Sequence, residues 1–152
     1  MAWFFVLGLG FHKLMVFSST PAIVTAGPER WPLSLAASAP RAKPLLVMFV
    51  HPQCACSRAS ISELANVLAE AHGRLDARVY ILRIPGAEQG WEETDLLRSA
   101  RRIPGVEVIT DVGGVAARHL SATVSGEASL YAPDGRRVFH GGLTAARGHE
   151  GD

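Results

Sequence analysis

Apolar residues dominate the first 17 positions of the chain, MAWFFVLGLGFHKLMVF, and the apolar character continues more weakly to Val24. A helix rises about 1.5 Å per residue, and crossing a bilayer takes roughly 20 residues. Lys13 lies near the middle of the run, where a lysine costs about 2.5 to 3.5 kcal/mol on insertion scales. We therefore expect residues 1–24 to form a membrane anchor, or else a signal segment or an N-terminal helix of a soluble protein.

Prolines at positions 28, 32, 40 and 44 interrupt residues 25–44, with small residues between them. Proline removes a backbone donor and disfavours helix at the residue before it. This stretch is predicted to be an extended linker, or an arm that lies on the domain with Trp31-Pro32-Leu33 as its anchor. The domain itself is expected over residues 45–152.

From Leu45 onward, the hydrophobic pattern predicts alternating strands and helices. The all-apolar run Leu45–Val50 is typical of a central strand buried on both faces. Between about Ser57 and His72, apolar residues recur at spacings of three and four, which marks one face of a helix. Further strands are predicted at 78–84, 106–110, 128–131 and 136–140, and further helices at 92–102 and 115–120. This β-α-β-α-β-α-β-β order predicts a three-layer α/β sandwich with parallel strands, helices on both faces and an antiparallel hairpin.

Composition narrows the classes of function. The 152 residues suit one domain, and a hydrophobic content of 48% with a mean hydropathy of +0.17 excludes a disordered chain. Fifteen basic residues are scattered among fourteen acidic ones, so we expect no nucleic-acid partner. Two cysteines exclude a disulfide-stapled mini-domain and a closed four-cysteine zinc site.

Both cysteines lie in the loop HPQCACSR, between the first strand and the helix that begins near Ser57. Backbone N–H groups and the positive end of the helix dipole favour the thiolate at such a place. Ser57 could donate a hydrogen bond to the Cys54 thiolate, and Arg58 could stabilise it by charge. The alternatives are that Ser57 only caps the helix and that Arg58 only covers its solvent face.

The cysteine loop and the order of elements resemble the thioredoxin-like fold, in particular its membrane-tethered extracytoplasmic branch, which is similar to the TlpA reductases. More narrowly, three tracts resemble the RedB family of small thioredoxin-like proteins: MFVHPQCACSRASISEL, TVSGEASLYAPDGRRVFHGGLT and RGHEGD. The resemblance covers the chain from about Trp31. It implies a redox domain on the periplasmic side of a membrane, exchanging electrons with thiols and disulfides of partner proteins.

The chain departs from the motif of working thioredoxins. Cys54 matches the first cysteine of C-x-x-C, Ser57 occupies the second cysteine's place, and Cys56 comes one residue early. A Cys54–Cys56 disulfide would need a non-helical loop, because residues two apart on a helix point about 200° apart. Gly126 falls where the fold usually has a cis-proline. The usual last helix is expected to reach little more than its first turn, at Thr144–His149.

Three hypotheses follow. The leading one is a thiol-disulfide oxidoreductase without a cofactor, with Cys54, Cys56, Ser57 and Arg58 as its site. The second is a copper- or zinc-binding module that combines both cysteines with His51, His140 or His149, because thiolates and imidazole suit these metals. Against it, His51 could simply cap the end of the strand. The third is a degenerate domain that serves only as a binding surface.

Overall fold

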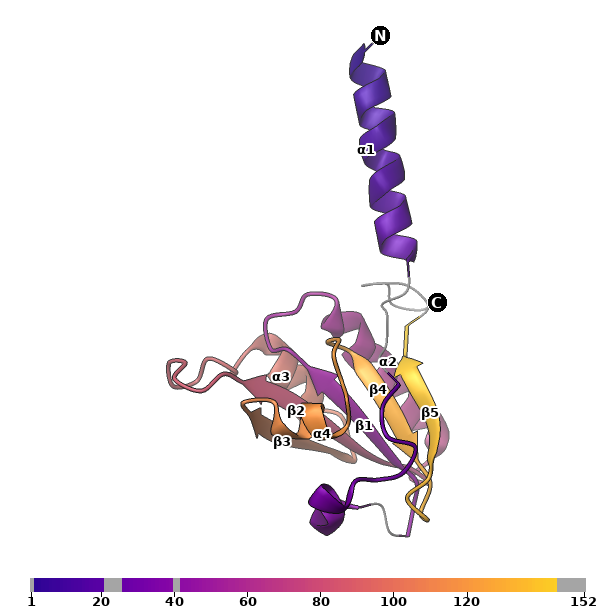
Figure 1. The fold of residues 1–152 in the computed structure, drawn as a ribbon, viewed down its shortest axis with the longest axis vertical. Coiled ribbons are helices and arrows are strands. Elements are labelled where there is room, and N and C mark those ends of the chain that lie inside the picture. The colour runs from indigo at the N-terminus through magenta and orange to yellow at the C-terminus, as the bar shows by residue number, and fades with distance from the viewer. Residues whose placement is uncertain (1, 21–25, 40–41, 145–152) are drawn as a thin grey trace.

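The computed structural model describes residues 2–20, 26–39 and 42–144 (Figure 1). After residue 44, the strands and helices follow the predicted order. The elements are α1 (Ala2–Ser19), the 3-10 helix η1 (Leu33–Ser38), β1 (Leu45–Val50), α2 (Ser57–Ala71), β2 (Asp76–Arg83), α3 (Asp95–Arg101), β3 (Val106–Val112), α4 (Val115–His119), β4 (Glu127–Tyr131) and β5 (Arg137–Gly142).

The five strands form one mixed sheet in the order β3-β2-β1-β4-β5. Strands β1, β2 and β3 run parallel, whereas β4 is antiparallel to β1 and β5 to β4. Phe49, near the end of β1, pairs with Tyr80 on one side and with Glu127 on the other. The predicted α/β sandwich with a closing hairpin is therefore confirmed, and the cysteine loop leaves the sheet from its central strand.

Helices cover both faces of the sheet and give the domain two apolar layers. Helices α2 and α3 pack on one face, where Leu64 and Leu97 are completely or almost completely buried. Helix α4 and η1 pack on the other face, around Tyr131 and Leu120. All six residues of β1 are buried, as predicted for a strand with helices on both sides. This packing holds the start of α2 firmly against the end of β1.

The proline-rich stretch lies on the domain as an arm. Trp31 is only 8% exposed, its ring meets that of Tyr131 edge to face at 5.0 Å, and its Nε1 donates to the carbonyl oxygen of Leu35 at 2.8 Å. Residues 29–31 also run beside the hairpin: the Trp31 N–H donates to the Gly135 carbonyl, and the Arg137 N–H to that of Glu29, both at 2.7 Å. Of the predicted anchor Trp31-Pro32-Leu33, Trp31 is packed on the domain, whereas Leu33 is 91% exposed and begins η1 instead of extended chain.

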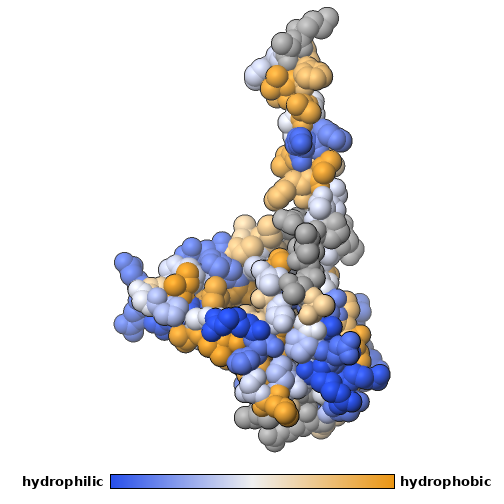
Figure 2. Space-filling view, in the orientation of Figure 1, coloured by the Kyte–Doolittle hydropathy of each residue, from blue (hydrophilic) through white to orange (hydrophobic). Residues whose placement is uncertain are grey.

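Helix α1 stands apart from the sheet and shows apolar surface along its length, interrupted by polar atoms (Figures 1 and 2). Its large side chains stay in contact with solvent, with Phe4 76% and Phe11 65% exposed. In the part of the chain that the structure describes, however, no helix is both long and apolar enough to span a bilayer. The transmembrane helix expected within residues 1–24 is therefore not found there; Lys13 interrupts the apolar sequence, and α1 ends at Ser19.

Candidate active site

Cys54 and Cys56 lie in a tight turn between β1 and α2, at the carboxyl end of the parallel strands. The Cys54 N–H donates to the His51 carbonyl at 3.0 Å, and the Ser57 N–H donates to the Cys54 carbonyl at 3.2 Å. Cys56 is the N-cap of α2 and already has helical dihedral angles, φ −63° and ψ −28°. Both thiols are free, Cys54 half-buried and Cys56 exposed. The turn is thus nearly helical, a geometry that keeps side chains two residues apart from meeting.

The sulfur of Cys54 is surrounded by hydrogen-bond donors. Partial burial raises the pKa of its thiol, but hydrogen bonds from the Ser57 hydroxyl, the Ser57 N–H, the Ser125 hydroxyl and the Cys56 N–H together outweigh burial. The net pKa of Cys54 therefore lies below its ordinary value of 9.0. A donor stabilises a thiolate more than a thiol, so this arrangement favours the nucleophilic form.

Ser57 and Ser125 form a hydroxyl pair behind that sulfur. Their oxygens are 2.6 Å apart, and the Ser125 oxygen also accepts the His51 N–H at 2.8 Å. The pair has only two hydroxyl protons to share between the contact with each other and the contacts with Cys54. At 2.6 Å one hydroxyl donates to the other, which leaves one of the two protons for the Cys54 sulfur. Because either serine can be the donor in that contact, either hydroxyl can present its proton to the sulfur.

Gly126 allows the segment that carries Ser125 to come this close to α2. Its φ of +91° lies in the left-handed region, and a Cβ added there would be 2.6 Å from the Ser60 Oγ and 3.9 Å from the Ser57 Oγ. Its N–H donates to the Phe49 carbonyl at 2.7 Å, which ties the segment to the end of β1. The position predicted to replace the cis-proline thus accommodates a close approach that a side chain would block.

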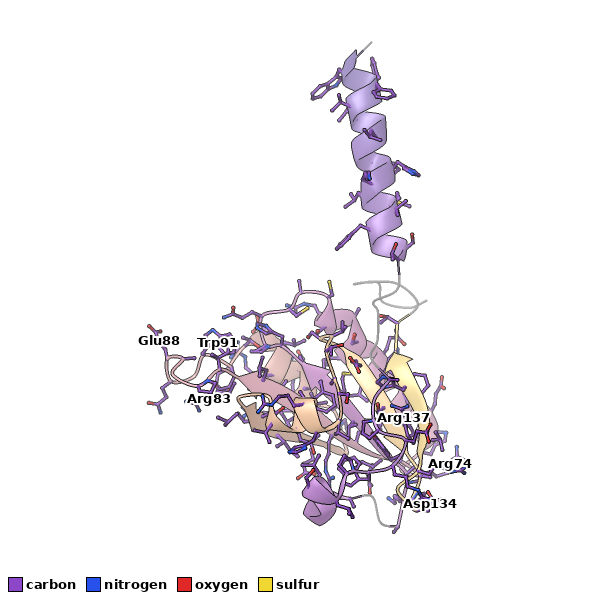
Figure 3. All side chains as sticks on the ribbon, in the orientation of Figure 1. Arg74, Arg83, Glu88, Trp91, Asp134 and Arg137 are labelled. Carbon is purple, nitrogen blue, oxygen red and sulfur yellow. The ribbon has the colours of Figure 1, made fainter. Side chains whose placement is uncertain are left out.

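His51 lies beside the cysteines, but its contacts are structural. Its Nδ1 accepts the Gln53 N–H at 3.2 Å, and its ring meets that of Trp91 edge to face at 5.4 Å. Trp91 belongs to the loop between β2 and α3, at the same end of the molecule as Arg83 and Glu88 (Figure 3). These contacts hold the His51 ring against the loop and agree with the capping alternative.

The metal alternative gains no support from the described residues. Nowhere among them do three His, Cys, Asp or Glu side chains come together in a way that could hold a metal ion. His140 instead contacts Ser129 and Glu127, since its Nδ1 lies 2.7 Å from the Ser129 Oγ and its Nε2 3.4 Å from the Glu127 Oε1. His149 lies outside the described residues, as does most of the helical turn expected at Thr144–His149.

Among the residues predicted for the site, the structure brings Cys54 and Ser57 together and leaves Cys56 at the surface. Arg58 is exposed and is not among the groups that shift the pKa of Cys54; its charge acts on the Asp95 carboxyl, whose pKa is lowered mainly by its hydrogen bond with Arg98. Ser125 was not predicted. Its position beside Gly126, 68 residues from Ser57, gives no local signal in the sequence.

Solved structures of other proteins share this architecture. A secreted disulfide oxidoreductase of Mycobacterium tuberculosis, homologous to E. coli DsbE, matches with a TM-score of 0.53 and 20% identity, over 67% of this chain and 70% of that one. The chain has a thioredoxin-like fold. A thiol:disulfide interchange protein DsbE from Chlorobium tepidum, described as putative, matches over 82% and 84% of the two chains, with a TM-score of 0.53 and 16% identity. StoA from Bacillus subtilis matches with 0.54 and 11%, over 69% and 78%.

These identities are low, so the matches show the thioredoxin-like fold and nothing about the reaction. The chemistry has to be argued from the residues around Cys54. No family model matches the sequence, and neither does any curated protein. The narrower resemblance to the RedB family therefore stays a prediction. The departures from C-x-x-C expected from the sequence, with Ser57 at the second cysteine's place and Gly126 at that of the cis-proline, likewise stay predictions.

Proposed function

We propose that the protein is a thiol-disulfide oxidoreductase that acts on partner proteins, with Cys54 as the attacking thiolate. The observation that carries the proposal is the set of donors from Ser57, Ser125 and Cys56 around the Cys54 sulfur, which lowers its pKa. The disulfide oxidoreductases with the same fold support it by analogy. Cys56 is the only other cysteine of the chain and takes the role of resolving thiol.

In the first step, the Cys54 thiolate attacks one sulfur of a partner disulfide. The partner's S–S bond breaks, its second sulfur leaves as a thiolate and is protonated, and a mixed disulfide with Cys54 forms. Cys56, as thiolate, then attacks the Cys54 sulfur and releases the partner's first sulfur. Two electrons have moved to the partner, and Cys54 and Cys56 are joined. The reverse sequence oxidises a partner dithiol.

Closing the second bond requires the turn around Ala55 to open, since Cys56 starts from helical dihedral angles. The resulting small ring is strained, and a strained disulfide is easily reduced. This favours a domain that passes its disulfide on readily. It also slows resolution, which should lengthen the life of the mixed disulfide compared with a C-x-x-C protein.

Trapping of mixed disulfides tests the proposal. Without reductant, Cys56→Ser should accumulate covalent complexes with partner proteins, because Ser57 cannot replace a resolving thiol. Dithiothreitol should reduce the mixed disulfide and separate these complexes. Cys54→Ser should capture none, since the exposed Cys56 lacks the donors that surround Cys54. Equal capture by the two variants, or none by either, would contradict the assignment of Cys54 as nucleophile.

We further propose that the domain works outside the cytoplasm and is held at a membrane by its apolar N-terminal segment. The exposed apolar side chains of α1 support attachment, and cysteine pairs persist as disulfides mainly in oxidising compartments. Cell fractionation of the full chain tests this. Recovery in the membrane fraction, with Cys54 accessible to a membrane-impermeant thiol reagent in intact cells, is expected; recovery in the cytosol would contradict it.

A further inference from the structure

Glu127 is a buried carboxylate only two residues after Ser125. It is 3% exposed, and its Oε2 accepts the N–H groups of Thr123 and Val124 at 2.9 and 3.1 Å. The Glu127 N–H in turn donates to the Val124 carbonyl at 3.2 Å, which closes the turn from both sides. Burying a carboxylate costs several kcal/mol unless it is well paired. Glutamate here therefore needs these partners, and it fixes the backbone just before Ser125.

His140 lies beside the other oxygen of this carboxylate. Its Nε2 lies 3.4 Å from Oε1 of Glu127, and its Nδ1 lies 2.7 Å from the hydroxyl of Ser129, which can donate to it. The contact with Ser129 is therefore a hydrogen bond, whereas the contact with Glu127 is one of proximity. Among the described residues, Oε1 has no hydrogen-bond partner, so Glu127 is held through Oε2, against the turn before β4.

The contacts continue from this turn to the redox cysteine. Thr123 and Val124 lead directly to Ser125, whose hydroxyl is 2.6 Å from that of Ser57 and bonds the Cys54 sulfur. Lengthening the 2.6 Å contact between the two hydroxyls by about 1 Å would take it beyond hydrogen-bond range, so Ser125 depends on the position of the turn. Glu127 touches neither sulfur nor hydroxyl, so any effect on Cys54 must pass through the backbone.

We infer that Glu127 is a positioning residue for the redox site: through the two N–H groups bound to its Oε2, it sets the turn 123–126 so that the Ser125 hydroxyl reaches the Cys54 thiolate. This rests on the proposed function, because it concerns the nucleophile named there. It predicts that a buried carboxylate on the far side of the turn controls how readily Cys54 reacts.

The test is the pH profile of Cys54 alkylation by iodoacetamide. It is measured in the full chain with Cys56→Ser, so that Cys54 is the one thiol that can be alkylated. Glu127→Ala should move the profile to higher pH and slow alkylation at neutral pH about threefold, as Ser125→Ala should, because a lost donor lowers the thiolate fraction. Glu127→Gln keeps an oxygen for the Thr123 and Val124 N–H groups, so it should restore the profile. The double variant of Glu127→Ala and Ser125→Ala should be no slower than either single one.

Asp111 provides a matched control. It is also buried, at 6% exposure, and accepts two backbone N–H groups, those of Ala116 and Ala117 at 2.9 and 3.0 Å, but at the start of α4. Asp111→Ala should lower the melting temperature and leave the profile of Cys54 unchanged. If Glu127→Ala does not fold, Glu127→Asp serves, because its shorter side chain keeps the charge but cannot hold the turn in the same place.

Three results would overturn the inference: an unchanged profile in Glu127→Ala or Glu127→Asp, an equal shift in Asp111→Ala, or additive effects of the Glu127 and Ser125 substitutions. Each is independent of the trapping experiment, which tests whether Cys54 attacks partner disulfides at all. Successful trapping with an unchanged alkylation profile would remove the role of Glu127 and leave the proposed function in place.

Discussion

Two serine hydroxyls distinguish Cys54 from Cys56, although the two cysteines are separated by one residue. Cys54 receives donors from Ser57, from Ser125 and from the first backbone N–H groups of α2, whereas Cys56 caps the helix with its side chain exposed. A helix N-terminus stabilises a thiolate only when the sulfur lies over the free N–H groups. The proposed division of roles between the two thiols therefore rests on the surroundings of each sulfur.

Removing either hydroxyl should make Cys54 less reactive. In a Cys56→Ser background, Ser57→Ala and Ser125→Ala should each raise the pKa of Cys54 and slow its alkylation at neutral pH about threefold, because fewer molecules carry the thiolate. The loss should vanish at alkaline pH, where the thiol ionises without help. Stopped-flow alkylation from pH 5 to 10 measures this, with Ser62→Ala on α2 as a control that should match the parent. A profile that stays in place would show that the hydroxyls do not stabilise the thiolate.

The contributions of Ser57 and Ser125 differ in how far the sequence reveals them. Ser57 follows the cysteines directly, so its role could be predicted from the loop alone. Ser125 reaches the site only because β4 lies next to β1, a pairing between segments that are far apart in the chain. Arg58 is near Cys54 in the sequence, but its side chain lies at the surface, which agrees with the alternative that it covers the solvent face of the helix.

Among the elements, β1 and α2 were predicted closely because burial imposes a regular pattern on them. The start of α3 was placed too early, at Glu92, whereas the helix begins at Asp95 after the Thr94 cap. Glu92 is instead a buried partner of Arg83, with the two side chains 3.1 Å apart. In the sequence, an acidic residue just before a helix is easily assigned to the first turn of that helix. The ion pair with Arg83, which depends on the tertiary structure, explains why Glu92 is not part of α3.

The turn before β4 depends on Gly126. Gly126→Ala should destabilise the domain by about 1 to 3 kcal/mol, since alanine is strained at a φ of +91° and its Cβ would lie 2.6 Å from the Ser60 Oγ. Adding Ser60→Ala removes that oxygen and should recover part of the loss but not the backbone strain. Urea denaturation of the two single variants and the double variant measures this. A fully additive double variant would show that the two residues do not collide.

At the scale of the whole molecule, the arm belongs to the folded domain and α1 does not. Trp31→Ala should destabilise by about 3 to 5 kcal/mol, because it empties a site packed against Tyr131. Leu33→Ala, two residues along and 91% exposed, should have almost no effect. Thermal unfolding followed by circular dichroism compares them. Equal stability of both variants would mean that the arm is not anchored through Trp31.

Removing residues 1–20 should leave the melting temperature of the domain within about 2 °C of the full chain, because the large apolar side chains of α1 are exposed rather than packed on the sheet. The same truncation should abolish recovery with membranes if α1 provides the attachment. A large fall in melting temperature would show that α1 contributes to the core.

The hydrogen bonds between the arm and the hairpin also protect the edge of the sheet from pairing with another chain. Residues 29–31 occupy part of the outer edge of β5, where unpaired N–H and carbonyl groups would otherwise face solvent. An open edge is a template on which a second chain can add a strand. A shortened protein that begins at Lys43 would leave this edge without the hydrogen bonds of residues 29–31. Such a protein would be expected to form oligomers through β5, so solubility here depends on residues that precede the sheet in the sequence.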